Sequence, residues 1–367
     1  MIFFHINCRY LQQINLMNMK NRCLLMLVLW LFAIVAVPAQ DKKFAIYPVG
    51  FYNLENLFDT CHDAGKKDYE FLPTGSYKWN GLKYSHKLAN LARVLSDMGT
   101  DVHPNGCVAI GVSEVENAKA LDDLVAQPAL AARGFKYCHI EGPDRRGVDC
   151  ALLYDPKQFK VNGVVLHPYV QSLEKDSAFF TRGFLTVSGE MAGEPLTIIV
   201  NHLPSRFSGS FYREQGARQL TVIKDSILKS NPKTKVLIMG DMNDDPMDKS
   251  MAEELRGRRE IEEVGKNDMY NPWWNVLAKD CTGTLLYNGS WNLFDQILLT
   301  PNLLCKPGKR DYSTLKYLKC QVFRRDYLFQ QEGKYKGSPL RTHAGGIWLD
   351  GYSDHLPTIV YLVKQVK

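Results

Sequence analysis

The sequence of 367 residues has none of the extremes that mark several classes of protein. Its hydrophobic fraction of 45% and charged fraction of 23% are ordinary for a globular chain, which excludes a disordered or collagen-like protein. Nine cysteines do not make a small disulfide scaffold, and none stands in a Cys-X-X-Cys pair, which argues against a thiolate metal site or a redox motif. The formal charge of +6 is too small to identify a partner.

Three well-known functional motifs are also missing. The sequence contains no glycine-rich P-loop and no serine in a Gly-X-Ser-X-Gly elbow. Residues 240–246, GDMNDDP, are rich in Asp but lack the spacing and the terminal Glu of an EF-hand loop. These absences exclude P-loop phosphate binding, the serine-elbow hydrolases and EF-hand calcium binding.

The apolar run near the N-terminus is too short to cross a membrane. Residues 24–37 are fourteen consecutive apolar residues, whereas a spanning helix needs about 20. Two basic residues precede the run and Val37-Pro38-Ala39 follows it, a pattern typical of a secretory signal peptide over residues 1–39. A membrane anchor is the alternative interpretation.

Cleavage before Gln40 would give an exported protein, periplasmic or secreted, and Met17 or Met19 would give the leader a conventional start. The leader holds three basic and no acidic residues, so its removal lowers the formal charge from +6 to +3. Seven cysteines remain, and although export permits disulfides, their number and spacing predict no particular pairing. Cys107 and Cys150 adjoin apolar runs and are expected to be buried.

The remaining chain contains strand-like and helical segments without repeats. Runs rich in Val, Ile, Leu and aromatic residues predict strands over 44–52, 107–115, 149–154, 196–201, 235–239, 293–299 and 358–363. Apolar spacing and Ala/Leu-rich composition predict helices over 84–98, 118–132 and 211–228. No low-complexity linker divides the chain, so we expect one large α/β domain over residues 40–367, although the length alone suggests two.

Polar residues gather at the ends of these predicted strands. They are Asn53, Glu114, His202, Asp241, Asn243, Asp354 and His355, with Asp295 inside an apolar strand. Ligands of α/β sheets gather at strand ends, where loops converge. Each residue alone has a structural interpretation as a turn or helix cap, but a carboxylate at an apolar strand position such as Asp295 needs a partner.

The same residues suit metal-assisted hydrolysis of a phosphate ester. They are carboxylates, amide side chains and two imidazoles, and this set favours Mg²⁺, with Mn²⁺ or Ca²⁺ as alternatives, over Zn²⁺. In such chemistry the metal offsets charge on phosphorus, a carboxylate orients the attacking water and a cationic histidine binds the phosphoryl oxygens.

Six segments, in one order along the chain, carry a family resemblance. They are SEVEN at 113–117, RGVDCALLYDP at 146–156, NHLPSR at 201–206, GDMNDDP at 240–246, FDQILL at 294–299 and SDHLP at 353–357. The chain resembles the endonuclease/exonuclease/phosphatase superfamily, the deoxyribonuclease I-like proteins, over residues 45–362, and looks like a secreted bacterial member. The resemblance implies an α/β four-layer sandwich, in which two mixed β-sheets pack face to face with helices on the outside.

The resemblance also implies a role for each matching residue. Glu114 matches the principal metal-binding carboxylate, and Asn53 and Asp354 match residues beside the metal. Asp241 matches the residue that orients or deprotonates the attacking water, and Asn243 matches one that helps to hold the phosphate.

Two histidines complete the implied site. His355 matches the residue that contacts the scissile phosphate, and Asp295 resembles its carboxylate partner, which would raise the pKa of the imidazole. His202 matches the second histidine of the nuclease branch. Asp149 is the candidate acidic partner of His202, although the loop lengths differ there.

Basic residues favour a polyanionic substrate. Arg146 and Arg206 are phosphate-binding candidates because a planar guanidinium suits phosphate oxygens, although either could be a surface charge. The span Lys306–Arg341 carries a local charge of +7, and Arg206, Arg213 and Arg218 lie near aromatic residues. Cations with aromatics are typical of nucleic-acid binding, so the prediction is a nuclease acting on DNA or RNA. Arg213 and Arg218 could instead be the solvated face of a helix.

Other substrates stay open because the superfamily also contains sphingomyelinases and inositol-polyphosphate phosphatases with overlapping core residues. A phospholipid phosphodiesterase would expose an apolar hairpin, for which Tyr270–Trp274 is the candidate, although core packing of its Trp residues is expected. An inactive binding protein is a further alternative, against which the complete residue set argues.

We expect a monomer with no stable membrane span after leader cleavage. The polar insertion Asp59–Trp79, with His86 and Lys87, either rims the site or is a structural loop.

Overall fold

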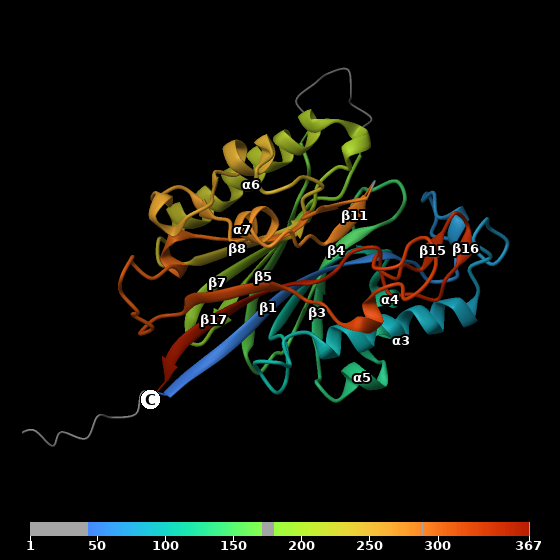
Figure 1. Ribbon diagram of the computed structural model, residues 1–367, viewed down its shortest axis with the longest axis horizontal. Coiled ribbons are helices and arrows are strands. Elements are labelled where there is room, and N and C mark those ends of the chain that lie inside the picture. The colour runs from blue at the N-terminus through green and yellow to red at the C-terminus, as the bar shows by residue number, and fades with distance from the viewer. Residues whose placement is uncertain (1–42, 171–179, 288, 367) are drawn as a thin grey trace, which may run out of the picture. The chain divides into compact units, whose positions relative to one another are not determined.

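The computed structural model of the chain describes residues 43–170, 180–287 and 289–366 (Figure 1). The leader predicted over residues 1–39 lies outside this part of the chain. Within it, no helix is both long and apolar enough to cross a membrane. The residues Phe44–Val366 form one unit built around two β-sheets.

The first sheet has six strands in the order β14-β17-β1-β2-β4-β3. Its strands are β1 (Lys43–Leu57), β2 (Ala109–Val115), β3 (Lys136–His139), β4 (Asp149–Tyr154), β14 (Lys316–Val322) and β17 (Thr358–Val366). β1 and β2 pair in parallel, whereas β4 runs antiparallel to β2 and to β3, so the sheet is mixed. β1 continues five residues beyond the predicted strand over 44–52 and carries Asn53 and Glu55 with it.

The second sheet has seven strands in the order β5-β6-β7-β8-β13-β10-β9. Its strands are β5 (Phe159–His167), β6 (Phe184–Met191), β7 (Glu194–His202), β8 (Lys235–Asp241), β9 (Gly257–Arg258), β10 (Met269–Tyr270) and β13 (Asp295–Leu299). β7 and β8 are parallel, and β13 runs antiparallel to β8. Two small hairpins stand outside the sheets, β11 (Leu285–Tyr287) with β12 (Ser290–Asn292), and β15 (His343–Ala344) with β16 (Ile347–Trp348).

The two sheets pack face to face through a continuous apolar core. Buried residues of β1, β2 and β4 join those of β6, β7, β8 and β13 in one cluster. The sheets approach so closely at Gly111 of β2 that a Cβ there would lie 2.5 Å from the Sδ of Met239 on β8, which explains why glycine occupies this position. Cys107 and Cys150 are buried as expected, and all seven cysteines of the described residues are free thiols.

Helices cover the outer faces of both sheets (Figure 1). The helices are α3 (Gly81–Asp97), α4 (Ala118–Val125), α5 (Pro128–Ala131), α6 (Ser210–Ser230) and α7 (Trp273–Ala278). Short turns of 3₁₀ or π type are η1 (Tyr69–Phe71), η3 (Arg206–Ser208), η4 (Ser250–Glu254), η5 (Ile261–Glu263), η6 (Pro301–Leu303) and η7 (Asp326–Leu328). The buried residues Ala217 and Leu220 of α6 pack with Ile199 and Ile238 of the second sheet in a separate outer cluster. The predicted four-layer α/β sandwich is therefore confirmed.

One predicted helix is two. The helix expected over residues 118–132 ends at Val125 and resumes at Pro128, because proline is accepted at the first position of a helix but not in its interior. The helix predicted over 84–98 begins three residues earlier and ends one residue earlier, and the one predicted over 211–228 gains one residue at its start and two at its end. Asn80 caps α3 by accepting from Lys83 N.

Candidate active site

The ends of four strands bring the polar residues together at one edge of the sandwich. β1 and β2 are parallel to each other, as are β7 and β8, so their carboxyl ends place Asn53 beside Ser113 and His202 beside Asp241. The antiparallel register of β13 sets Asp295 directly across from Asp241. Such a strand-end edge is the expected place for a ligand site in an α/β sheet.

Asp241 is the centre of this group. Its Oδ2 accepts a hydrogen bond from Asn53 Nδ2 at 3.0 Å and lies 3.4 Å from His202 Nε2 and 3.8 Å from His355 Nε2. Its Oδ1 accepts from the backbone nitrogen of Asn243 at 2.9 Å. Burial raises the pKa of Asp241 to about 7 against the opposing effect of His355, with Asp295 contributing in the same direction as burial. This carboxylate can therefore take up a proton near neutral pH.

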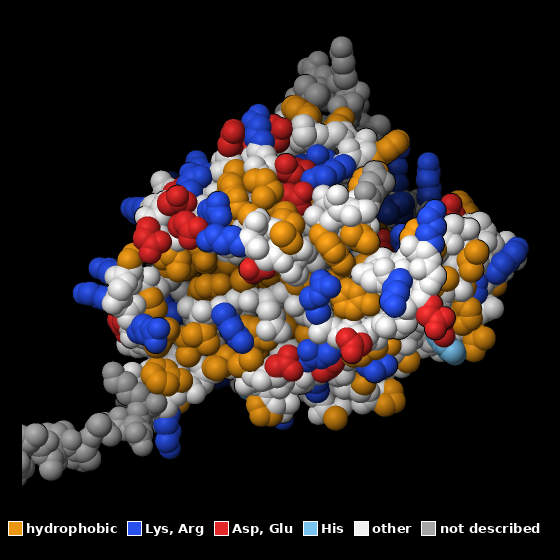
Figure 2. Space-filling view, viewed as in Figure 1, with side chains coloured by type: hydrophobic (Ala, Val, Ile, Leu, Met, Phe, Trp, Pro, Cys, Tyr) orange, Lys and Arg blue, Asp and Glu red, His pale blue; other side chains and the backbone are white. Residues whose placement is uncertain are grey.

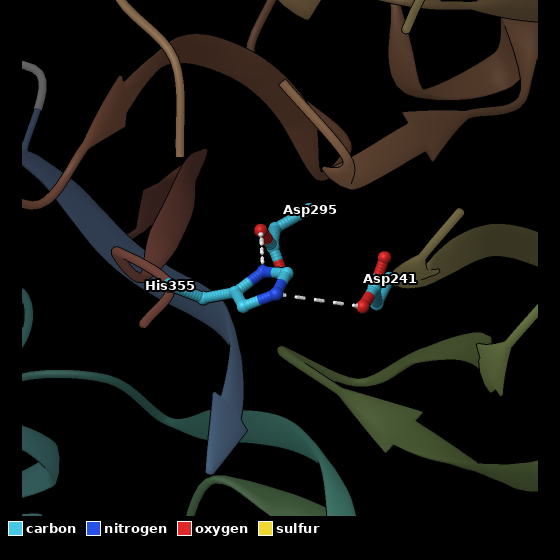
Figure 3. A group of neighbouring side chains, drawn as sticks. All are labelled: Asp241, Asp295 and His355. Carbon is cyan, nitrogen blue, oxygen red and sulfur yellow. Dashed lines mark hydrogen bonds and ion pairs between the residues drawn. The ribbon is translucent and has the colours of Figure 1, made fainter. Parts of the chain in front are cut away.

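His355 is held by a buried carboxylate (Figure 3). Its Nδ1 lies 2.7 Å from Asp295 Oδ2, and its Nε2 faces Asp241. Burial acts to lower the pKa of His355, but the charges of Asp295 and Asp241 outweigh it and raise that pKa well above its usual value. The imidazole is therefore a cation at neutral pH, as the sequence-based pairing with Asp295 predicts.

His202 has a different environment. It is buried, its Nδ1 has no hydrogen-bond partner among the described residues, and its Nε2 lies 3.9 Å from Glu114 Oε1. Burial lowers the pKa of His202 well below its usual value, and Arg182 and Arg146 add to the effect. His202 is therefore neutral in the folded protein.

The structure does not bring Asp149 to His202. Asp149 accepts a hydrogen bond from Gly142 N at 3.0 Å and lies 3.3 Å from His139 Nε2. Asp149 is the first residue of β4 and lies across from Val115 on the neighbouring β2. Its bond with Gly142 N fixes the loop that leads into β4. The order of residues in the sequence could not show that His139, on the neighbouring β3, is the histidine that contacts Asp149.

Glu114 adopts an unusual backbone conformation at the end of β2. Its φ is +63°, and Glu55 and Asn56 at the end of β1 have φ of +51° and +56°. The register of β1 and β2 shifts here, and Asn56 N donates to Glu114 Oε2 at 2.9 Å. Left-handed backbone in residues other than glycine is strained and is concentrated at functional sites. Here it places the other oxygen, Oε1, near His202.

Asp354 faces a network that the sequence motifs did not identify. Its Oδ2 accepts from Arg341 Nη2 at 2.8 Å, and Arg341 Nε donates to Glu55 Oε1 at 3.2 Å. The buried Lys87 donates to Thr342 Oγ1 at 2.5 Å and lies 4.0 Å from Glu55 Oε2. Lys87 thus lies beneath the site rather than on its rim.

The insertion Asp59–Trp79 packs against the chain between β3 and β4. Lys66 Nζ donates to the carbonyl of Gly142 at 3.1 Å, and Trp79 is fully buried with its Nε1 donating to Phe58 O. His86, which could have joined the rim, is exposed and lies 3.0 Å from Asp350.

A cavity of about 420 Å³ opens beside these residues. Its lining includes Glu114, His202, Asp241 and His355 together with Arg146 and Arg182. Both arginines contact Asp144, Arg146 at 3.7 Å and Arg182 at 3.2 Å. Arg182 was not predicted, because it precedes β6 outside all the motif segments.

Arg206 lies outside this cavity lining. It pairs with Asp245 at 3.1 Å and with Asp248 at 2.9 Å, and its guanidinium stands 4.6 Å from the ring of Phe294. Its charge is therefore already balanced by carboxylates that follow the Asp241 motif.

The donor atoms fit a hard divalent cation. Asp241, Asp295 and His355 are the one group in the described part of the chain whose ligand atoms lie within 4.8 Å of one another. Asp295 and His355 are already bonded to each other, which reduces their capacity as ligands. Glu114 lines the cavity, and no described residue donates a hydrogen bond to its Oε1. The sequence-based candidates Asn53 and Asp354 are not part of this lining: Asn53 Oδ1 accepts from Glu55 N at 2.9 Å, and Asp354 Oδ2 accepts from Arg341 Nη2 at 2.8 Å. Carboxylate and amide oxygens are the ligands that Mg²⁺ prefers.

Comparison with known families agrees with the fold. Residues 48–364 match the profile of the Endonuclease/Exonuclease/phosphatase family. A comparison with curated protein sequences finds no significant match.

Solved structures of low sequence identity share the architecture. An endonuclease/exonuclease/phosphatase family protein from Bacteroides thetaiotaomicron is 15% identical with a TM-score of 0.53, over 89% of this chain and 98% of that one. A mannosyl-6-phosphatase from the same organism is 16% identical with a TM-score of 0.52, over 86% and 99%. TDP2 from D. rerio, complexed with a single strand DNA product, is 13% identical with a TM-score of 0.51, over 87% and 99%.

Proposed function

Because the chain belongs to the endonuclease/exonuclease/phosphatase family, and is thus a phosphoric ester hydrolase, we propose that it is a divalent-metal-dependent phosphodiesterase that cleaves nucleic acid. The observation that carries the proposal is the arrangement of Asp241 between a cationic His355 and a neutral His202, next to Glu114. The family uses divalent metals, and the charge of such an ion, held by Glu114 with Asn53 and Asp354, would stabilise the negative charge of the transition state.

The residues of the chain divide the remaining work. Asp241, whose pKa of about 7 suits a general base, holds the attacking water and takes its proton. The His355 imidazolium, fixed by Asp295, donates a hydrogen bond to a phosphoryl oxygen and offsets its charge. Asn243, whose Nδ2 is anchored on the carbonyl of Leu203 at 3.0 Å, can hold a second oxygen.

Two observations support nucleic acid as the substrate. Arg146 and Arg182 line the cavity of about 420 Å³ beside Asp241, the catalytic cavity of this proposal. They share the single carboxylate of Asp144, so one positive charge is left to favour an anionic group extending beyond the scissile phosphate. TDP2 shares the fold and has been solved with a DNA product. The arginines of α6 do not add support, because Arg213 pairs with Asp244 at 2.7 Å and Arg218 with Glu254 at 2.7 Å.

A phospholipid substrate receives less support. The Tyr270–Trp274 segment proposed for membrane contact contains the fully buried Trp273, whose Nε1 donates to Ile297 O at 3.0 Å. Trp291 packs elsewhere, 5.2 Å from the guanidinium of Arg324. The segment therefore belongs to the protein interior, as its core interpretation predicts.

A substrate panel tests the proposal. The purified protein with Mg²⁺ is offered plasmid DNA, a single-stranded oligonucleotide, RNA, sphingomyelin vesicles, inositol phosphates and a bis-aryl phosphodiester. We expect cleavage of nucleic acid that is abolished by a chelator, with Asp241→Asn as the matched inactive control. Cleavage of lipid or inositol phosphate without cleavage of nucleic acid would overturn the substrate assignment.

A further inference from the structure

Three hairpins stand beside the catalytic strand ends and enclose a second cavity. They are β11–β12, β15–β16 and the chain reversal between Phe329 and Pro339, which pair as an isolated bridge. The cavity has a volume of about 840 Å³, twice that of the catalytic cavity, and residues of all three hairpins line it. Neither the family match nor the motif segments assign a role to it.

This hairpin cavity reaches the catalytic residues. His355 lines the catalytic cavity and its chain neighbour Asp354 lines the hairpin cavity. Leu285, in the wall of the hairpin cavity, forms a bridge with His355, and Leu356 N donates to Thr284 O at 2.8 Å. A substrate with its phosphate at His355 can therefore extend into the hairpin cavity.

The walls of the hairpin cavity are apolar and its rim is basic. Leu285, Leu286, Pro339, Ile347 and Leu349 contribute apolar surface. Figure 2 shows Lys and Arg side chains next to hydrophobic ones over the region at the right of the view, where Figure 1 places β15 and β16. An apolar chamber with cations at its entrance suits an anionic ligand that also carries an apolar or aromatic group.

The rim charge comes from the tip of the 329–339 hairpin, the sequence Lys334-Tyr335-Lys336. Both lysines line the cavity, and neither has a carboxylate partner among the described residues. Tyr335 between them is 56% exposed. Arg341 is the remaining cation of the lining, and its charge is balanced by Asp354 at 2.8 Å. The two lysines therefore leave an uncompensated positive charge next to an accessible aromatic ring.

Backbone hydrogen bonds close most of this tip, and Ser338 Oγ adds a bond to the carbonyl of Tyr335. Gly333 and Gly337 have φ of +76° and +84°, and the reversal is closed by Gln330 N to Ser338 O and Gly337 N to Gln330 O, both at 2.9 Å. These bonds use backbone atoms and the Ser338 hydroxyl, whereas the ring of Tyr335 is 56% exposed and lies 5.5 Å from the ammonium of Lys334. An exposed aromatic that the fold does not need is available for a ligand.

We infer that the hairpin cavity binds an unpaired base and the adjoining phosphates of a single-stranded nucleic acid whose scissile phosphate lies at His355. Every base has a face that stacks on an aromatic ring, and lysines beside the ring neutralise the backbone. The side-chain amide of Gln330 in the lining supplies a donor for the edge of a base, which an acyl chain would not use. The inference rests on the proposed function and names the part of the substrate that the catalytic cavity does not hold.

Equilibrium binding tests the inference apart from turnover. The probe is a fluorescent oligo-dT, measured by anisotropy with full-length protein in the Asp241→Asn background. Tyr335→Ala is expected to weaken binding about tenfold, the loss typical of one base without its aromatic partner. Phe44→Ala is the matched control, because Phe44 has a similar exposure and lies at the start of β1, away from the end that carries Asn53. This variant should bind as the parent does.

The lysines are tested by salt dependence. Lys334→Ala combined with Lys336→Ala should lower the slope of log affinity against log salt by about 1.4, because two phosphate contacts with a single strand are lost. The control pair is Lys306→Ala with Lys309→Ala, two exposed lysines between η6 and β14. Equal affinities for the Tyr335 and Phe44 variants, or equal slopes for the two lysine pairs, would overturn the inference.

Two further outcomes distinguish a failure of the hairpin-cavity assignment from a failure of the proposed nuclease activity. Tyr335-dependent binding to anionic phosphatidylglycerol vesicles in place of the oligonucleotide would also overturn the inference and identify a membrane-binding surface. Tyr335-dependent oligonucleotide binding by a protein that cleaves only the bis-aryl diester would support the cavity assignment and refute the proposed nuclease.

Discussion

The two histidines of the site contact the same carboxylate oxygen of Asp241 from different surroundings. His355 lies 3.8 Å from it and is bonded to the buried Asp295, whereas His202 lies 3.4 Å from it and its Nδ1 has no partner within the described part of the chain. Burial disfavours the cation in both, and a second carboxylate reverses this effect only for His355. One residue type therefore supplies a cation and a neutral imidazole a few ångströms apart.

The difference divides the site by charge. The His355 side combines a cation with two carboxylates, and the Glu114 side combines a carboxylate with the neutral His202 and the nearby arginines. Under the proposed function, a phosphate between them would meet an imidazolium on one side and, on the other, the carboxylate proposed to hold the metal. A neutral His202 avoids adding a third positive charge to the side where Arg146 and Arg182 stand.

The largest effect is expected at the residue that both histidines share. Asp241→Asn keeps the side-chain shape but cannot accept a proton, so turnover of the bis-aryl phosphodiester should fall by about 10² to 10⁴. Steady-state kinetics with Mg²⁺ measure this loss, and circular dichroism confirms the fold. A variant with more than a tenth of the normal turnover would show that Asp241 is not the general base.

Replacing each histidine in turn tests whether their imidazoles differ in charge. His355→Gln removes a cation that faces the phosphate and should lower kcat by about 10² to 10³. His202→Gln replaces a neutral donor by a neutral donor and should lower kcat by about tenfold. The two variants are compared at pH 7 on the same substrate, and equal losses would contradict the assignment of charge.

Asp295→Asn should make the surroundings of His355 resemble those of His202, because the second carboxylate beside His355 is neutralised. Asp295 raises the pKa of His355, so its neutralisation lowers that pKa and the imidazolium is lost at a lower pH. We expect kcat/KM to fall by about tenfold to a hundredfold at pH 7 and the alkaline limb of its pH profile to move to lower pH. Asp149→Asn is the matched control, because Asp149 contacts His139 and not either catalytic-site histidine. An unchanged alkaline limb in Asp295→Asn would refute the role of Asp295 in keeping His355 protonated.

The contrast also shows what a sequence can predict. Asp295 is identifiable because a carboxylate in an apolar strand segment needs a partner, and the structure places it at the first position of β13. Its pairing with His355 follows from the family motif. That His202 Nδ1 has no hydrogen-bond partner among the described residues does not follow from the motif. It depends on whether Asp149 of β4 faces β3 or β7, and loop length alone does not determine that.

The arginines were the least predictable part of the site. Arg206, Arg213 and Arg218 follow His202 in sequence, yet each is paired with a carboxylate 31 or more residues away, in the region after Asp241. Arg182, which lines the catalytic cavity, has no motif around it. Composition counts charges, but only tertiary contacts decide which of them are already balanced.

The smallest expected effect is on stability, where the two histidines should act with opposite sign. The folded-state pKa of His202 is depressed below the ordinary value of about 6.5, so below that pH the unfolded chain binds a proton that the folded chain does not. His202 therefore destabilises the fold as pH falls, by at most about 1.4 kcal/mol per pH unit. His202→Gln should flatten the loss of unfolding free energy between about pH 6.5 and pH 5.

His355 has a raised folded-state pKa, so its contribution to stability is fully present below about pH 6.5 and is lost as pH rises through the folded-state pKa. His355→Gln should accordingly lower the free energy of unfolding most at acid pH and least at alkaline pH, which is the reverse of the pH dependence expected for His202→Gln. Urea unfolding in a chelator, so that no metal contributes, measures both series. Parallel pH dependences would mean that the two imidazoles carry the same charge in the folded protein, and the division of the site into a cationic and a neutral histidine would fail.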